Sequence, residues 1–222
     1  MIRTDRREKK LKENKRRDGF MTPYAITITR QFGSEGREIG KQLAERLHCH
    51  YYDRSAIEQE AAQKDESLAA LVALKQVEGY YKMAYPLGIG SSLKQEKMFQ
   101  AQSEVLLEHA AKENCVIVGR CADYVLRNQE RVLRCYLYAP DAYRASSVAS
   151  LNLSTASEYQ PLIDEVDKAR ASYYLKYTGY PVDNLELRDL VVNTACLGLE
   201  GTVEMLAAFA AKKFGLNLKE QA

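Results

Sequence analysis

The sequence predicts an α/β fold with a mostly parallel five-stranded sheet covered by helices on both faces. Apolar runs of strand length lie near residues 25–30, 50–53, 115–119, 132–138 and 189–193. Segments with helical patterns separate these runs, as parallel strands require. The chain has 222 residues with 46% hydrophobic content, which is enough for one sizeable core with an appendage rather than two independent domains.

The stretch 25–48 organises the rest of the chain, because it combines a strand, a glycine turn and an amphipathic helix. Residues 26–29 are β-branched and predict a buried strand, and the turn that follows contains Gly33, Ser34 and Gly36. Apolar residues then recur at every fourth position of a helix: Ile39, Leu43 and Leu47. A helix that begins after a glycine turn directs unpaired backbone N–H groups and partial positive charge at one spot. A phosphate fits that spot.

The glycine spacing differs from that of a Walker A loop, G-x-x-x-x-G-K-[ST]. Six residues separate Gly33 from the next Gly-Lys pair, and three separate Gly36 from it. A tight turn without a ligand therefore remains an alternative to a phosphate site. Arg30 at the strand end and Arg37 in the first helical turn favour the phosphate site, because cations are unfavourable at a helix N-terminus unless an anion lies between.

The sequence contains neither a signal-peptide pattern nor an apolar run approaching about 18 residues, so we expect neither export nor membrane insertion. Five cysteines are scattered without a C-x-x-C pair: Cys49, Cys115, Cys121, Cys135 and Cys196. Two of them lie in apolar runs that predict strands. We expect reduced, mostly buried thiols in a cytoplasmic protein.

The formal charge of +2 is a property of the N-terminal residues. Residues 1–20 contain nine Lys or Arg and four Asp or Glu, which leaves 23 basic and 26 acidic residues for residues 21–222. We expect a solvated, poorly ordered basic arm followed by one domain. Contact with a nucleic acid or an anionic surface is the alternative, but no interleaved aromatic residues or nucleic-acid module support it.

Residues 49–53 predict a second short strand. His48 and His50 form an H-x-H pattern that would place both rings on one strand face, as in a metal site. Ordinary histidines at a strand end are the alternative, because no third ligand lies nearby in the sequence, and we assign no metal ligand. Asp53 and Arg54 stand where the carboxyl end of the strand meets the next helix, which is where open α/β sheets assemble their ligand sites.

Residues 54–113 predict a helical insertion between two strands. Helical patterns cover residues 54–64, 66–78 and 96–113, and the last of these carries an apolar stripe that includes Phe99, Val105, Leu106 and Ala110. Residues 79–90 have no period and are rich in tyrosine. These rings could stack on a nucleobase, since tyrosine offers an apolar face with a polar tip, or they could serve packing or a dimer contact.

The apolar run 115–119 predicts a central buried strand, and Arg120 follows its carboxyl end. If the sheet is parallel, this cation lies beside the glycine turn and is placed to bind an anion. A salt bridge with Asp53 or a neighbouring carboxylate is the alternative. Residues 131–139 predict the next strand, and Arg144 lies one turn into the helix that follows it.

Residues 151–188 are polar, and within them Asp167 and Arg170 share one helix face at positions i and i+3. A solvated ion-pair face is the simplest interpretation of these charges. The run 190–193 predicts the last strand, and residues 200–213 predict a closing amphipathic helix after a loop at 194–199.

The run TITRQFGSEGREIGKQLAERL is followed by YYDRSAI, and then by VIVGRCADYVL at 116–126, YAPDAYRA at 138–145, DKARASYY at 167–174 and DLVVNTACLGLE at 189–200. Together these segments resemble the cytidylate kinase-like family of P-loop proteins, which are relatives of the nucleoside monophosphate kinases. The resemblance runs from about Tyr24 to Phe214. No single motif is decisive, but the order and spacing of the set are fairly specific.

The resemblance implies a P-loop NTPase-like three-layer α/β/α fold that transfers the γ-phosphoryl group of ATP to a nucleoside monophosphate. CMP or dCMP is the first expected acceptor, ATP and Mg²⁺ are the implied cofactors, and a monomer or homodimer is expected. Such chemistry requires substrates in line, Mg²⁺ between the phosphates, and positive groups around the transferred oxygens.

The resemblance also assigns residues to these roles. The donor phosphates would lie on the loop formed by Gly33, Ser34, Glu35, Gly36 and Arg37, with Arg30 beside it. The acceptor would be held by Asp53, Arg54, Arg120 and Arg144. Residues 151–188 would form a lid, in which Asp167 and Arg170 match an Asp-x-x-Arg pair that contacts the acceptor. Four cations would act on the transferred group: Arg37, Arg120, Lys168 and Arg170.

The phosphate loop departs from the kinase pattern at two positions. In register with the kinases, the P-loop lysine falls at Gly36, and the hydroxyl residue that binds Mg²⁺ falls at Glu38. Arg37 or Lys41 could supply the missing charge, although a guanidinium does not simply replace an ammonium at a crowded phosphate. Glu38 could ligate Mg²⁺ or repel the phosphates.

Two functions from different classes therefore remain open: an active, atypical nucleotide kinase, and a nucleotide-binding or regulatory module that keeps the fold without the chemistry. A third possibility is that the donor or the acceptor is not a nucleotide. The kinase pattern also has an aspartate directly after Arg120, where this chain has Cys121 and offers Asp123 two positions later.

Overall fold

The computed structural model describes residues 22–65, 68, 92–151 and 159–217. The expected helix at 66–78 lies almost wholly outside the described residues. The basic arm at 1–20 and the tyrosine-rich segment 79–90 lie wholly outside them.

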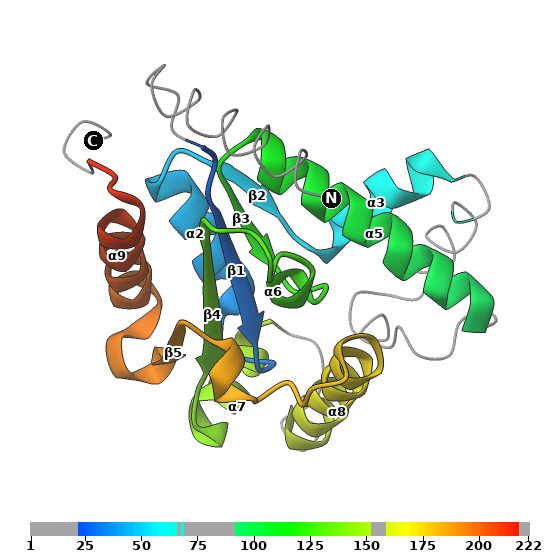
Figure 1. Cartoon of the computed structure of the whole chain (residues 1–222). Coiled ribbons are helices and arrows are strands. Elements are labelled where there is room, and N and C mark those ends of the chain that lie inside the picture. Colours follow the sequence, from blue (N-terminus) through cyan, green and yellow to red (C-terminus); the bar gives the residue numbers. More distant parts are fainter. Residues whose placement is uncertain (1–21, 66–67, 69–91, 152–158, 218–222) are drawn as a thin grey trace.

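The five described strands form one sheet in the order β2-β3-β1-β4-β5, and every neighbouring pair is parallel (Figure 1). The strands are β1 (Ala25–Arg30), β2 (His50–Tyr52), β3 (Cys115–Val118), β4 (Val132–Tyr138) and β5 (Leu190–Asn193). In register, Ile28 pairs with Val118 of β3 on one side and with Cys135 of β4 on the other. The predicted α/β fold with a parallel five-stranded sheet is confirmed.

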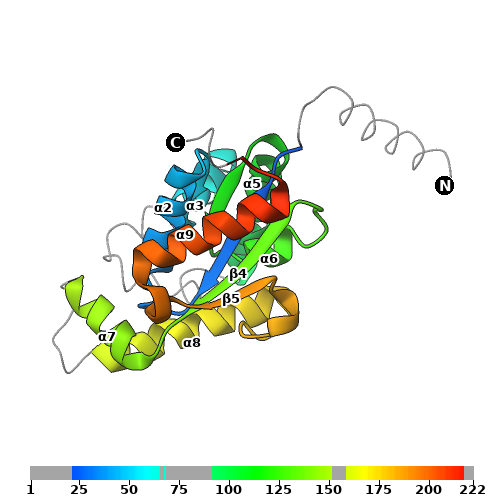
Figure 2. The same cartoon turned by 90° about the vertical axis from the view of Figure 1, so that its left-hand side faces the viewer.

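Helices cover both faces of the sheet, and their bounds are α2 (Gly36–Arg46), α3 (Arg54–Lys64), α5 (Ser92–Lys112), α6 (Ala122–Val125), α7 (Asp141–Ser150), α8 (Tyr159–Thr178) and α9 (Thr194–Phe214), with a 3₁₀ turn η3 (Leu185–Leu187). Figure 2 shows α9 crossing one face of the sheet. In Figure 1, α7 and α8 lie at the arrowhead end of the strands. The carboxyl edge of the sheet is therefore bordered by these two helices.

One core layer lies between the sheet and the pair α2 and α9. Ile26 and Ile28 of β1 face it, together with Leu43 of α2 and Leu206 of α9. Among the described helices, α9 is long and apolar enough to cross a membrane by length and composition, a test that a buried core helix also passes. A stripe of its side chains that includes Val203, Leu206, Ala207 and Ala210 packs into this core layer.

The second core layer lies between the opposite face of the sheet and the helices α3, α5 and α6. Ile117 of β3 and Ile57 of α3 are fully buried there, as is Leu106 of α5. The alternation of β1 and β3 side chains between the two layers follows from the two-residue period of a strand. The α3 and α5 pair therefore packs against this face of the sheet.

Two local expectations are wrong, and one short helix was not predicted. The segment 194–199, expected as a loop, is a helical turn of α9 that is interrupted at Gly198, whose φ is 66°. His48 does not share a strand face with His50, because β2 begins at His50 and His48 has a φ of 48°. The short helix α6, which follows β3, was not expected from the sequence.

The cysteines are free thiols, as expected. Cys115, Cys121 and Cys135 are buried, and burial raises the pKa of each thiol to about 12. Cys196 is exposed. The three buried thiols therefore remain protonated and serve as small core side chains.

Candidate phosphate and acceptor site

The loop between β1 and α2 lies at the carboxyl edge of the sheet. Gly33 and Glu35 have positive φ values of 80° and 58°. Glu35 occupies the N-cap position of α2 without donating or accepting a capping hydrogen bond through its side chain. Its carboxylate instead accepts a hydrogen bond of 2.6 Å from the hydroxyl of Tyr143. The first N–H groups of α2 therefore have no side-chain cap at this end, where a phosphate would be stabilised.

The loop is tied to β4 by hydrogen bonds within the protein. The Ser34 hydroxyl is fully buried and donates to the Gln31 carbonyl at 2.9 Å. The Gln31 N–H donates to the Leu137 carbonyl at 3.0 Å, and the Gln31 side-chain oxygen accepts from the Ala139 N–H at 3.2 Å. Ser34 thus holds the loop in shape with its side chain, so any phosphate contact it makes would come from its backbone.

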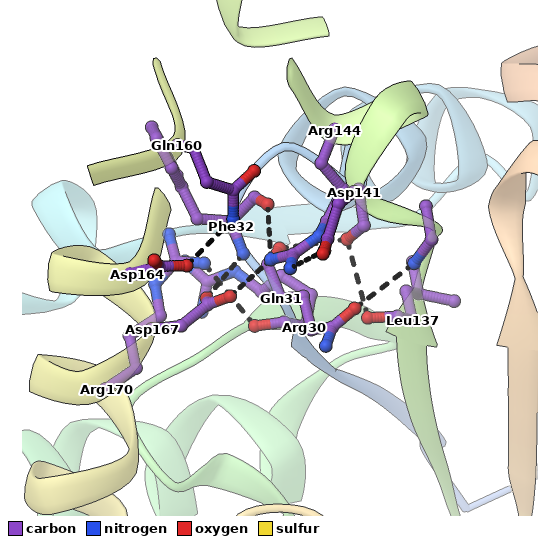
Figure 3. Close-up of polar contacts among 12 residues, drawn as sticks. Arg30, Gln31, Phe32, Leu137, Asp141, Arg144, Gln160, Asp164, Asp167 and Arg170 are labelled. Carbon is purple, nitrogen blue, oxygen red and sulfur yellow. Dashed lines mark hydrogen bonds and ion pairs between the residues drawn. The ribbon is translucent and has the colours of Figure 1, made fainter. Parts of the chain in front are cut away.

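Arg144 of α7 and Asp167 of α8 close one side of the loop (Figure 3). The Asp167 carboxylate accepts from the Phe32 N–H at 2.7 Å and pairs with Arg144 at 2.5 Å. Arg144 is buried, pairs also with Asp141 at 2.6 Å, and donates to the Phe32 carbonyl at 3.4 Å. Burial alone would lower the pKa of Arg144, but its bonds with Asp141 and Asp167 outweigh burial and raise it. The guanidinium is therefore held charged inside the protein.

The resemblance assigned Arg144 and the Asp167–Arg170 pair to the acceptor, but in the structure these side chains contact the loop between β1 and α2. A Cβ at Gly33 would lie 2.8 Å from the Arg144 carbonyl oxygen and 2.9 Å from the Arg144 Cβ, so Arg144 packs directly against the loop. Asp167 and Arg170 do share a helix face, as predicted. Arg170 donates to the Arg30 carbonyl at 3.4 Å, and its guanidinium carbon lies 5.3 Å from the Phe32 ring centroid. The pair contacts the loop between β1 and α2, whereas Lys168 is exposed on the same helix.

Asp53 and Arg37 meet at the start of α3. Asp53 caps this helix, accepting from the N–H groups of Ser55 at 2.9 Å and Ala56 at 3.2 Å. Its other carboxylate oxygen pairs with Arg37 at 2.7 Å. Arg37 is 52% exposed, so this pair is partly screened by solvent. The location of Asp53 at the strand-to-helix junction is as predicted, and its salt bridge is with Arg37 rather than with Arg120.

Arg54 and Arg120 instead converge on Glu58, one turn into α3. Glu58 accepts from the Arg54 Nε at 3.0 Å and pairs with Arg120 at 3.1 Å. The three side chains are 21%, 9% and 7% exposed for Arg54, Arg120 and Glu58 respectively. Burial and the nearby Arg120 both lower the pKa of Arg54. Within these three side chains there are two cations and one anion, an arrangement suited to an incoming phosphate.

The turn that carries Arg120 is strained. Gly119, Arg120 and Cys121 follow β3 with φ values of 86°, 57° and 53°. Non-glycine residues adopt this left-handed region rarely, at roughly 1–3 kcal/mol each, and such residues cluster at ligand sites. Arg30 reaches the same turn from the end of β1, since a Cβ at Gly119 would lie 2.3 Å from its Nη1. The turn therefore lies beside the phosphate loop as well as beside α3.

Several residues of this region were missed or were assigned differently from the sequence. Glu58 lies four residues after Arg54, and that helical spacing was the available signal. Tyr173 of α8 lies under Arg120, with 4.8 Å between the guanidinium carbon and the ring centroid. Asp123, by contrast, is buried and pairs with Arg188, and its carboxylate also accepts from the Tyr174 hydroxyl at 2.9 Å. Tyr173 lies in the segment DKARASYY but was given no role, and no sequence pattern pointed to Arg188.

A magnesium ion at this site would need a carboxylate ligand close to the loop between β1 and α2. Glu38 is exposed in the first turn of α2 and accepts from the Gln42 side chain at 3.1 Å. Within the described part of the chain, no group of three or more His, Cys, Asp or Glu side chains could hold a metal ion. Magnesium in phosphoryl-transfer sites takes one or two carboxylates together with substrate phosphates, so a single carboxylate beside the loop fits this need.

Comparisons with curated proteins find cytidylate kinases. The chain is 34% identical to the cytidylate kinase of Thermococcus kodakarensis over 100 residues, which cover 45% of this chain and 51% of that protein. It is 30% identical to the one from Archaeoglobus fulgidus, covering 50% of this chain and 62% of that protein. The chain thus spans between half and two thirds of these relatives. With the cytidylate kinase of Ignicoccus hospitalis the identity is 25%, covering 82% of this chain and 95% of that protein.

Comparisons with solved structures agree on the fold. An uncharacterized protein from Eubacterium ventriosum superposes with a TM-score of 0.66 at 17% identity, covering 84% of this chain and 98% of that one. A gluconokinase from Sinorhizobium meliloti gives 0.51 at 17% identity, with coverages of 90% and 98%. A shikimate kinase from Bacteroides thetaiotaomicron gives 0.50 at 14% identity, with coverages of 84% and 97%. At these identities the likeness concerns the P-loop kinase fold.

The sequence profile of the cytidylate kinase-like family matches residues 25–195, which include the phosphate loop, the Arg54–Glu58–Arg120 group and the Asp167–Arg170 face of α8. The chain therefore belongs to the cytidylate kinase-like family.

Proposed function

We propose that this protein is a phosphotransferase that moves the γ-phosphoryl group of ATP to a nucleoside monophosphate, with CMP or dCMP as the first acceptor to test. The supporting observation is the buried Arg54–Glu58–Arg120 group beside the loop at the start of α2. The loop at the start of α2 suits a donor phosphate, and the Arg54–Glu58–Arg120 group suits an acceptor phosphate. Both lie at the carboxyl edge of one parallel sheet.

In this proposal the donor phosphates lie on backbone N–H groups of residues 33–37, at the N-terminus of α2. The acceptor phosphate lies against Arg54 and Arg120, whose guanidiniums are oriented by Glu58. Phosphoryl transfer requires little covalent chemistry from the protein, so positioning and charge stabilisation provide most of the acceleration. In this proposal the two phosphates would meet along the shared edge of the sheet, as an in-line reaction requires.

ATP and Mg²⁺ are the cofactors of the proposed reaction. When bound, Mg²⁺ neutralises charge between the donor phosphates. Glu38 is the carboxylate that we assign to its binding, since it lies in the first turn of α2. Arg170, at the loop, and the exposed Lys168 are the cations that a lid containing α8 would bring toward the substrates.

A nucleotide-binding module without turnover is the second candidate. It is favoured by Gly36, which stands where kinases of this fold carry their loop lysine, and by Arg37, which pairs with Asp53. In that case the same two phosphate sites would bind nucleotides, but the charge that stabilises the transition state would be missing.

The experiment is an acceptor panel. Purified protein with Mg²⁺ and ATP is offered CMP, dCMP, UMP, AMP and GMP in turn, and diphosphate formation is followed. Arg120→Ala should abolish acceptor-dependent turnover, whereas Arg46→Ala, which removes an exposed cation at the far end of α2, should not change it. Flat traces with every acceptor, together with ATP or CMP binding measured by calorimetry, would refute the kinase and leave the binding module.

A further inference from the structure

We infer that Arg30 supplies the charge that the phosphate loop lacks, and that its guanidinium, carried from the end of β1, acts on the transferred phosphoryl group in place of a loop lysine. This inference rests on the proposed phosphoryl transfer. It differs from the sequence expectation, in which Arg37 or Lys41 would take this role.

The first observation is the space at Gly36, the position that corresponds to the loop lysine. A Cβ placed on Gly36 would lie 2.8 Å from the Arg30 Cγ and 2.9 Å from the Arg30 Cβ, distances that real Cβ atoms essentially never show. The stem of Arg30 therefore occupies the space in which a side chain at position 36 would begin. A side chain at 36 and the present path of Arg30 exclude each other, which explains why a glycine stands there.

The second observation is the position of the guanidinium. A Cβ on Gly119 would lie 2.3 Å from the Arg30 Nη1 and 3.2 Å from its Cζ. Gly119 donates its N–H to the Ile28 carbonyl at 3.0 Å and directly precedes Arg120. The two glycines thus line the path of one arginine, which starts at the loop and ends at the turn that presents the acceptor-side Arg120. That position lies between the two proposed phosphate sites.

The side chains of the other candidate cations follow different paths. Arg37 pairs with Asp53 at 2.7 Å on the exposed side of α2, and Lys41 is exposed further along the same helix. Arg144 pairs with Asp141 and Asp167 behind the loop. Arg170 donates to the Arg30 carbonyl and lies over the Phe32 ring. Among these described cations, Arg30 is the one whose side chain runs from the donor loop to the acceptor turn.

The chemistry assigned to Arg30 is electrostatic. The bond between the γ-phosphorus and the bridging oxygen of ATP breaks, a bond from the acceptor phosphate oxygen to that phosphorus forms, and ADP leaves with the bonding electron pair. Arg30 neither gains nor loses a proton. Its planar guanidinium donates hydrogen bonds to oxygens of the transferred group, and this contact is strongest in the transition state.

The test moves the positive charge from position 30 to position 36. Arg30→Ala should lower turnover by about 100-fold or more at a temperature where the variant remains folded, a size typical of losing one such contact. Gly36→Lys alone should also lower turnover, because the new side chain meets the Arg30 stem. Combining Gly36→Lys with Arg30→Ser should restore turnover at least about tenfold above Arg30→Ser alone. Arg46→Ala serves as the control for charge.

Two outcomes with an active wild type would overturn the inference. One is Arg30→Ala turnover within about twofold of the wild type, especially if Arg37→Ala abolishes turnover instead. The other is a combined variant no faster than Arg30→Ser.

A wild type that binds ATP without turnover refutes the proposed function separately. The inference then predicts that Arg30→Ala weakens ATP about tenfold more than ADP in calorimetry, and equal losses would overturn it. If the wild type binds no nucleotide, both statements fail together.

Discussion

Glu58→Gln should destabilise the free protein and at the same time increase the stabilisation that an acceptor nucleotide provides. Glu58 pairs with both Arg54 and Arg120, at 3.0 and 3.1 Å, and it is 7% exposed. Replacing the carboxylate by an amide of the same shape leaves two guanidiniums without this counter-charge. An acceptor phosphate would then replace the lost anion.

The size of this effect follows from the burial of the group. Breaking a buried ion pair costs about 3–5 kcal/mol, and the partial exposure of Arg54 favours the lower end, about 3 kcal/mol. For a chain of this size, about 3 kcal/mol corresponds to a melting temperature lower by roughly 6–12 °C. The penalty is mostly that of leaving charges unpaired, so it should fall when a phosphate takes the place of the carboxylate.

Differential scanning fluorimetry with and without CMP measures both quantities. Glu45→Gln, at an exposed position on α2, provides the matched control and should melt like the wild type. Glu58→Gln should melt well below both in buffer, and CMP should raise its melting temperature more than it raises that of the wild type. A Glu58→Gln variant that melts with the control, or that gains less from CMP than the wild type does, would contradict the assignment of this group to the acceptor phosphate.

Three further changes test other parts of the structure. Gly33→Ala should lower the free energy of unfolding by about 1–3 kcal/mol, because Gly33 has a φ of 80° and faces the Arg144 backbone, and an unchanged urea midpoint would argue against this loop geometry. Asp167→Asn should raise the KM for ATP because it removes the negative charge that pairs with Arg144 and so loosens α8 from the loop, and an unchanged KM would separate that ion pair from donor binding. Burial would raise the pKa of Glu113, but hydrogen bonds from Tyr52 and His109 outweigh it and lower the pKa, so its stabilisation is present above the ordinary carboxyl range and is lost as the pH falls below that range. Glu113→Gln should flatten this acidic part of the stability profile, measured by thermal melts, and a profile parallel to the wild type would refute the linkage.

The sheet was predictable because each strand is encoded locally. Runs such as 26–29 and 115–118 are β-branched or apolar over the length of a strand, and the helical segments between them force parallel pairing. The short helix α6 was missed, since it has only four residues and follows three residues with positive φ values, Gly119, Arg120 and Cys121. The first turn of α9 was missed because Gly198 interrupts the helix, and a glycine there indicates a loop by sequence alone.

The neighbourhood of the site was predictable, but the partners of its charges were not. Strand ends placed Asp53, Arg54 and Arg120 at one edge of the sheet, as the parallel topology requires. Arg120 was expected to bind an anion or to pair with Asp53 or a neighbouring carboxylate, and it pairs with Glu58. Long arginine side chains reach several carboxylates, so their choice depends on packing that the sequence does not specify locally.

The path of Arg30 also required the structure. Gly36 and Gly119 lie on different segments of the chain, and only the pairing of β1 with β3 brings the turn after β3 against the Arg30 side chain. From the sequence, the missing loop lysine appeared as a loss of charge. In the folded chain, the side chain of Arg30 runs past Gly36, the position of the missing lysine.

Phosphorus NMR of ATP, Mg²⁺ and CMP with the wild-type protein is the measurement that addresses the central claim most directly. The proposed phosphoryl transfer predicts that the γ-phosphorus signal of ATP declines while the β-phosphorus signal of CDP grows at the same rate, with ADP formed in equal amount. Release of inorganic phosphate without CDP, or a spectrum that stays unchanged although calorimetry shows that ATP binds, would contradict phosphoryl transfer to CMP.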